Sequence, residues 1–86
     1  MTIKEFEETV WRLEGIRLVV RETVDVQVDD YDYQNAANRT WSIAEWLRKR
    51  VEPCLPGSEF VVLDGQGVQP NRRTRLDTLR GSYAAE

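Results

Sequence analysis

The sequence contains no histidine and a single cysteine, Cys54. Without histidine, neither Ser-His nor Cys-His nucleophile pairs can form, and the usual zinc-binding patterns cannot be written. One cysteine also excludes a disulfide within the chain, which is typical of a reducing compartment, so we expect a cytoplasmic protein. We expect Cys54 to be a small buried side chain rather than a reactive thiol.

Long apolar runs are absent as well. The chain has no apolar N-terminal segment of the kind found in signal peptides, and no run approaches the roughly 18 apolar residues of a membrane-spanning helix. Its 86 residues, 41% hydrophobic and 31% charged, fit one small folded domain over residues 1–86. Residues 82–86 are expected to form a frayed tail.

A helix-start pattern opens the chain, because Thr2 can cap free amides and Glu5 can reach back to complete a capping box. The apolar spacing continues to Gly15, which would end a single helix. The alternative, which we favour, ends the helix near Glu8 and forms a β-hairpin over residues 9–22, where β-branched and aromatic residues alternate with charged ones.

Both alternatives place a strand from about Ile16 onward. The clearest helix signal lies later, over Ile43 to Val51, where apolar residues have helical spacing. Ser42 and Glu45 form a second capping box before it, and Pro53 ends it.

A further core strand is predicted from Glu59 to Leu63. Asp64 and Gly65 follow it with turn chemistry. A short final helix is predicted after Thr74 as its cap, with Gly81 as its stop.

This order of elements resembles the ubiquitin-like (β-grasp) superfamily. The resemblance implies an α+β fold in which a β-hairpin and one further strand pack on a central helix, with short N-terminal and C-terminal helices, and it implies a protein-binding role. The C-terminus lacks the paired glycines of a conjugatable tail, so the resemblance does not extend to conjugation. It is carried by residues 11–20, 43–51, 60–65 and 73–76.

The stretch VVLDGQGVQP raises the question of a phosphate-binding loop. Such loops need several amides directed at the anion, with either a Lys-Ser/Thr pair or a third glycine. After Gly65 and Gly67 neither follows, and Pro70 has no amide to donate. The stretch therefore predicts an ordinary turn, and we expect no cofactor.

An acidic segment with interleaved tyrosines is the most distinctive candidate surface. Carboxylates beside aromatic anchors could bind a protein partner with a basic surface; the alternative is a loop that only adds solubility. An EF-hand is excluded, because the loop lacks its central glycine and its final acid, so no metal is expected. The candidate partner-binding residues are Asp25, Asp29, Asp30, Tyr31, Asp32, Tyr33 and Trp41.

Arginines near the C-terminus form the second candidate surface. Arg72, Arg73, Arg75 and Arg80 could contact the phosphates of a nucleic acid, although the pI of about 5.0 favours a solvated basic face. A carboxylate-based enzyme remains a third alternative. No full set of nucleophile, base and orienting group can be assembled from the sequence, so we expect a non-catalytic interaction module.

Overall fold

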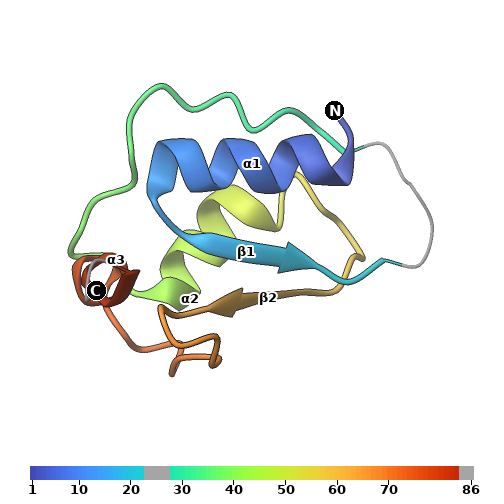
Figure 1. Cartoon of the computed structure of the whole chain (residues 1–86). Helices are drawn as coiled ribbons and strands as arrows, with labels where there is room; N and C mark the ends of the chain where they lie inside the picture. Colours follow the sequence, from blue (N-terminus) through green and yellow to red (C-terminus); the bar gives the residue numbers. More distant parts are fainter. Residues whose placement is uncertain (23–27, 84–86) are drawn as a thin grey trace.

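The computed structural model describes residues 1–22 and 28–83 (Figure 1). It shows a small α+β arrangement in which helices pack against one face of a two-stranded antiparallel sheet. In chain order the elements are α1 (Ile3–Glu14), β1 (Arg17–Val20), α2 (Ile43–Trp46), the π-helix η1 (Leu47–Val51), β2 (Phe60–Leu63) and α3 (Leu76–Tyr83).

Helix α1 extends to Glu14, as in the alternative of a single helix ended by Gly15. The favoured β-hairpin over residues 9–22 is therefore wrong. The capping box at Thr2 forms as predicted, and Gly15 ends the helix with a φ of 68°, a left-handed conformation that suits glycine. Residues 9–14 form a helix because this conformation places Phe6, Val10 and Glu14 on one buried face of α1. With only one strand before α2 in the described residues, the β-grasp-like arrangement is not confirmed.

Two of the predicted strands are confirmed: the one expected from about Ile16 is β1 and the one expected from Glu59 to Leu63 is β2. Their register assigns each side chain to a face. Leu18 lies opposite Val62, and both are buried on the face toward the helices. Val19 lies opposite Val61, and both are only partly buried because side chains alternate between the two faces of a sheet.

The predicted central helix is confirmed, but it changes type midway. Ser42 accepts a hydrogen bond from the Glu45 amide at 3.1 Å, which supplies one half of the expected capping box. After Trp46, which is fully buried, the helix continues as the π-helix η1. The Glu52 amide donates to the Leu47 carbonyl five residues earlier, at 2.8 Å.

The last helix begins later and ends later than predicted. Thr74 lies in a turn before it rather than at its cap, and α3 continues through Gly81 to Tyr83. Ser82 and Tyr83 are therefore helical, while the rest of the predicted tail lies outside the described residues. Within residues 1–22 and 28–83, no helix is long and apolar enough to cross a bilayer.

Candidate interaction surface

The acidic segment lies in a long irregular stretch that crosses the structure between β1 and α2. We call residues 28–41 the acidic loop. It contains no helix or strand, and several of its backbone groups hydrogen-bond to other parts of the chain. Val28 exchanges backbone hydrogen bonds with Met1, 3.0 Å each way, and the Asp29 amide donates to the Cys54 carbonyl at 3.4 Å.

The centre of this stretch is held by one buried carboxylate, Glu14, at the end of α1. Its side chain is fully buried, yet both oxygens are saturated with donors. Oε1 accepts from the Ala37 amide at 2.8 Å and from Arg80 at 2.9 Å. Oε2 accepts from the Tyr31 hydroxyl, from Arg50 and from the Trp46 indole, at 2.5, 2.9 and 3.2 Å.

Two arginines compensate for the cost of burying this charge. A carboxylate removed from water is stable in a protein only when it is paired and hydrogen-bonded. Burial alone would raise the pKa of Glu14, but hydrogen bonds from Tyr31 and Ala37 and the charge of Arg50 outweigh it, so the pKa is lowered. Glu14 is therefore ionised in the folded protein at neutral pH.

The two arginines that donate to Glu14 also fix the path of the acidic loop. Arg50 donates to the Asn35 carbonyl at 2.8 Å, and Arg80 donates to the Ala37 carbonyl at 3.1 Å. Together with the Ala37 amide and the Tyr31 hydroxyl, these contacts hold the loop at three positions. The loop is irregular but anchored.

The anchored loop places some of the predicted partner-binding residues in the core and others at the surface. Tyr31 is only 2% exposed and packs edge-on against Phe6, so it lies in the core and not on the surface where the sequence placed it; its hydroxyl donates to Glu14. Asp29, Asp30 and Asp32 are exposed, as expected. Asp25 lies outside the described residues.

The two remaining aromatic candidates are half-buried and stacked against cations. Arg50 lies over the Tyr33 ring at 4.3 Å, and Lys49 lies over the Trp41 ring at 4.5 Å. Cation–π contacts of this kind occupy the ring faces. Both rings therefore have a basic neighbour, and Tyr33 in addition follows the exposed Asp32 in the chain.

The thiol of Cys54 lies beneath the acidic loop. It is buried, as predicted, and makes contacts of 3.7 and 3.5 Å with the carbonyls of Asp30 and Arg50. Burial, and then the charges of the nearby aspartates, raise the pKa of Cys54. A raised pKa disfavours the reactive thiolate.

The arginine segment is divided by the fold. Arg72, Arg73 and Arg75 are exposed, and Arg75 pairs with Asp77 at 2.8 Å. Arg80 is not available to a nucleic acid, because it donates to Glu14 and to the Ala37 carbonyl. Its donors are directed at Glu14 and Ala37 within the fold, so the exposed basic surface consists of the other three side chains.

The glycine stretch forms a turn, as predicted. The Asp64 carboxylate accepts the amides of Gln66 and Val68 at 2.9 and 3.0 Å. These amides are consequently engaged within the turn and do not point at an anion. The same contacts give Asp64 a structural role after β2.

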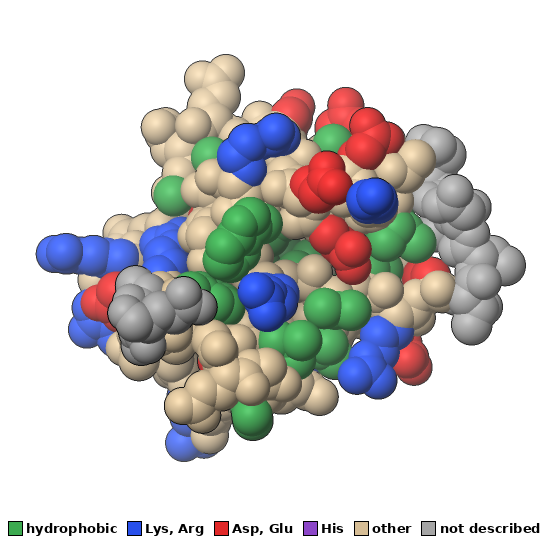
Figure 2. All heavy atoms as spheres, viewed as in Figure 1, with side chains coloured by type: hydrophobic (Ala, Val, Ile, Leu, Met, Phe, Trp, Pro, Cys, Tyr) green, Lys and Arg blue, Asp and Glu red, His purple; other side chains and the backbone are tan. Residues whose placement is uncertain are grey.

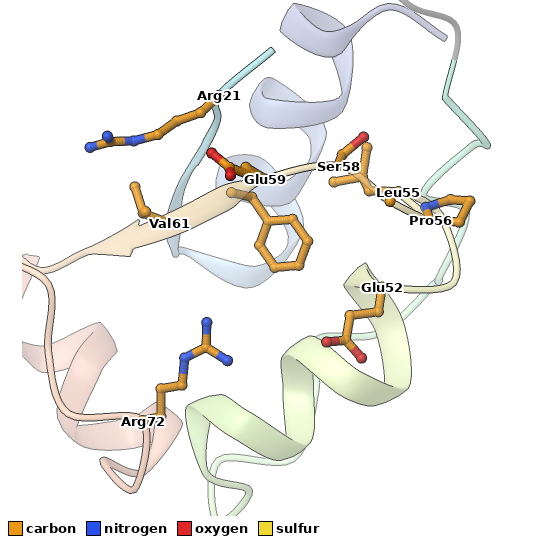
Figure 3. Close-up of a pocket in the computed structure, with 10 residues that line it drawn as sticks. Arg21, Glu52, Leu55, Pro56, Ser58, Glu59, Val61 and Arg72 are labelled. Carbon is orange, nitrogen blue, oxygen red and sulfur yellow. The ribbon is translucent and has the colours of Figure 1, made fainter.

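An open pocket of about 520 Å³ lies beside β2 (Figure 3). Glu52 and Arg72 line it from the helical side, while Glu59 and Arg21 line it from the sheet side, and Arg21 extends away from Glu52. Asp64, in the turn after β2, is not among its lining residues. Within the described residues, no group of three or more Cys, Asp and Glu side chains could hold a metal ion.

Comparison of the chain with models of protein families, with curated proteins and with solved structures finds no match in any of the three. The candidate surface therefore depends on the geometry alone.

Glu14 is a site residue that the sequence alone does not identify. Its one local signal is its place at the C-terminal end of a helix, where a negative charge is unfavourable. An acid at such a position needs cations from elsewhere in the fold. The two cations, Arg50 and Arg80, lie 36 and 66 positions along the chain from Glu14, so local spacing could not identify them.

Proposed function

We propose that this domain is a non-catalytic protein-interaction module that binds a basic partner through the acidic loop. The observation that carries the proposal is the contrast within the loop: Tyr31 is fixed inside by Glu14, while Asp29, Asp30 and Asp32 project outward. A loop held in one conformation loses little freedom on binding, which favours affinity.

The charges support a partner of opposite sign. Asp30 keeps 71% of its side chain exposed even though the N-terminal amine lies 3.4 Å from it. Exposed carboxylates act mainly by steering a basic partner toward the surface, and this attraction is screened over roughly 8 Å at physiological ionic strength. Tyr33, half-buried beside them, is the aromatic anchor of the proposed surface.

The test begins with affinity capture from an extract of the native host and identification of the captured protein by mass spectrometry. Binding rates of that protein are then measured for Asp30→Asn/Asp32→Asn. A matched control, Glu52→Gln/Glu59→Gln, removes the same charge from the pocket beside β2. We expect the aspartate variant to slow association severalfold at low salt and the control to change it much less.

Tyr33→Ala should change the dissociation rate of the partner and not its association rate. If the ring is an anchor, its removal speeds dissociation and leaves association nearly unchanged. An identified partner whose association and dissociation rates are the same for wild type and for both loop variants would overturn the proposal.

Nucleic-acid binding by Arg72, Arg73 and Arg75 is the second candidate, and it is favoured by their exposure on one short segment. Retention on immobilised DNA or RNA should then fall steeply with salt, and removal of Arg72 and Arg73 should flatten that dependence. No retention at low salt would exclude it.

A further inference from the structure

Among residues 1–22 and 28–83, helices cover only one face of the sheet. Its core face packs against the helices, whereas the other face carries Val19 opposite Val61 and Arg17 opposite Leu63. We call these four residues the outer sheet face. In the view of Figure 2, hydrophobic side chains gather over this region, with a basic side chain among them. None of the described helices or strands lies over it (Figure 1).

Two aromatic residues extend this surface beyond the strands. Trp11 of α1 is 46% exposed, and its ring meets the Tyr83 ring edge-on at a centroid distance of 5.3 Å. The Arg17 guanidinium lies 5.8 Å from the Trp11 ring. The Tyr83 hydroxyl accepts the Arg17 amide at 3.0 Å and donates to the Leu63 carbonyl, so the aromatic pair is fastened to the ends of both strands.

A groove of about 440 Å³ lies beside this surface, between α1 and β1. Its apolar lining comes from Trp11, Leu18 and Val19. Its charged lining is balanced, with two cations and two carboxylates, namely Lys4, Arg17, Glu7 and Glu8.

We propose that the outer sheet face and this groove form the interface of a symmetric homodimer. An exposed tryptophan beside an uncovered apolar sheet face is typical of an interface core. A second sheet packed face to face at about 10 Å would cover the remaining exposed surface of the partly buried Val19 and Val61, as in a β-sandwich. The occupant in this proposal is a second copy of this chain, because the groove carries two cations and two carboxylates that a copy of the same surface can match.

The balance of charge distinguishes this occupant from others. A strongly basic or strongly acidic partner would meet two like charges in the groove. In a two-fold interface, a contact between residue i of one copy and residue j of the other is repeated between residue j of the first copy and residue i of the second. The carboxylate of Glu8 in one copy can then face the Arg17 guanidinium of the other, twice over.

The experiment measures self-association by sedimentation over roughly 1 µM to 1 mM, the range that covers weak and moderate dimers. Val19→Asp should lower the association constant at least 30-fold, the loss typical of an interface hot spot. Val68→Asp is the matched control, because Val68 is 58% exposed in the turn after β2. This control should leave the association unchanged.

A charge-reversal pair tests the symmetry and does not depend on Val19. Glu8→Lys and Arg17→Glu change exposed residues, so the fold should persist, as far-UV circular dichroism would verify. Each variant alone brings like charges together and should dimerise weakly. An equimolar mixture joins opposite charges at both contacts and should recover the association.

Three results would overturn the proposal: a monomer at the highest concentration, a dimer that neither Val19→Asp nor the charge reversals weaken, or a mixture no stronger than its components. The dimer proposal is independent of the acidic loop. Asp30→Asn/Asp32→Asn should leave self-association unchanged, so failure of one proposal is distinguishable from failure of the other.

Discussion

Arg80 is joined to Glu14 by two hydrogen bonds, from Nε to the main-chain carbonyl at 2.7 Å and from Nη2 to Oε1 at 2.9 Å. The first bond satisfies a carbonyl at the end of α1, where helices leave such groups without partners. The second neutralises a buried carboxylate. Together they tie the last helix to the first across 66 residues of chain.

Replacement of Arg80 by alanine should destabilise the fold by about 3 kcal/mol. Removal of one partner from a buried ion pair typically costs 3–5 kcal/mol, and Arg50 still compensates Glu14 in this variant. Arg75→Ala is the matched control: its exposed pair with Asp77 should contribute less than about 1 kcal/mol. Urea unfolding of both variants measures the difference, and equal losses would contradict a structural role for Arg80.

Glu14 should make stability fall in acid. Its ordinary pKa of 4.5 is lowered in the folded protein because hydrogen bonds from Tyr31 and Ala37, with the charge of Arg50, outweigh the effect of burial. The ionised carboxylate therefore adds stability above pH 4.5, and this stability is lost as the pH falls through the folded-state value.

Glu14→Gln tests this pH dependence through the free energy of unfolding from pH 7 downward. The variant should be less stable than wild type at pH 7, and the gap should narrow below about pH 4.5. A gap that stays constant from neutral to acid pH would show that ionisation of Glu14 does not stabilise the fold.

Tyr31→Phe should cost about 2 kcal/mol, because it removes a buried hydrogen bond to a charged group. The lost hydroxyl donates to Glu14 at 2.5 Å and accepts from the Trp46 indole at 2.9 Å. Tyr33→Phe is the control, since Tyr33 is half-buried and packs through its ring. We expect its effect to stay within about 0.5 kcal/mol. Thermal or urea unfolding distinguishes the two, and a loss as large for Tyr33→Phe would refute the assignment.

Two glycines should respond to alanine in opposite directions. A Cβ at Gly65 would lie 2.0 Å from the Ser82 carbonyl oxygen in the backbone of α3, so the helix would have to move. We expect Gly65→Ala to cost about 2 kcal/mol. Gly81 lies within α3 and has open space around its Cβ position, so Gly81→Ala should stabilise by about 0.5–1 kcal/mol. A stability scan of both variants checks the pair.

Several elements were predictable because their signals act over a few residues. The capping box at Thr2 and Glu5 marks the start of α1 in the sequence and forms in the structure. The apolar spacing around Trp46 predicts the buried face of the central helix, and Trp46 is fully buried. The strand that ends at Leu63 was predicted by its run of β-branched residues.

The length of α1 could not be predicted from the sequence alone. Residues 9–14 satisfy both an alternating and a helical pattern, and the local signals nearly balance. In the folded chain, Val10 and Glu14 follow Phe6 along one buried face, which only the helix can provide. Packing against the rest of the core therefore selects between two locally acceptable structures.

The sequence by itself determined the helix caps, the apolar faces and the acidic composition of the loop, because these depend on neighbours a few positions apart. Only the tertiary structure decided that Tyr31 points inward while Asp30 and Asp32 point outward. That orientation depends on the Glu14 carboxylate, whose burial is stable only once donors from distant parts of the chain converge on it. No local pattern encodes such a convergence, since it exists only after the chain has folded.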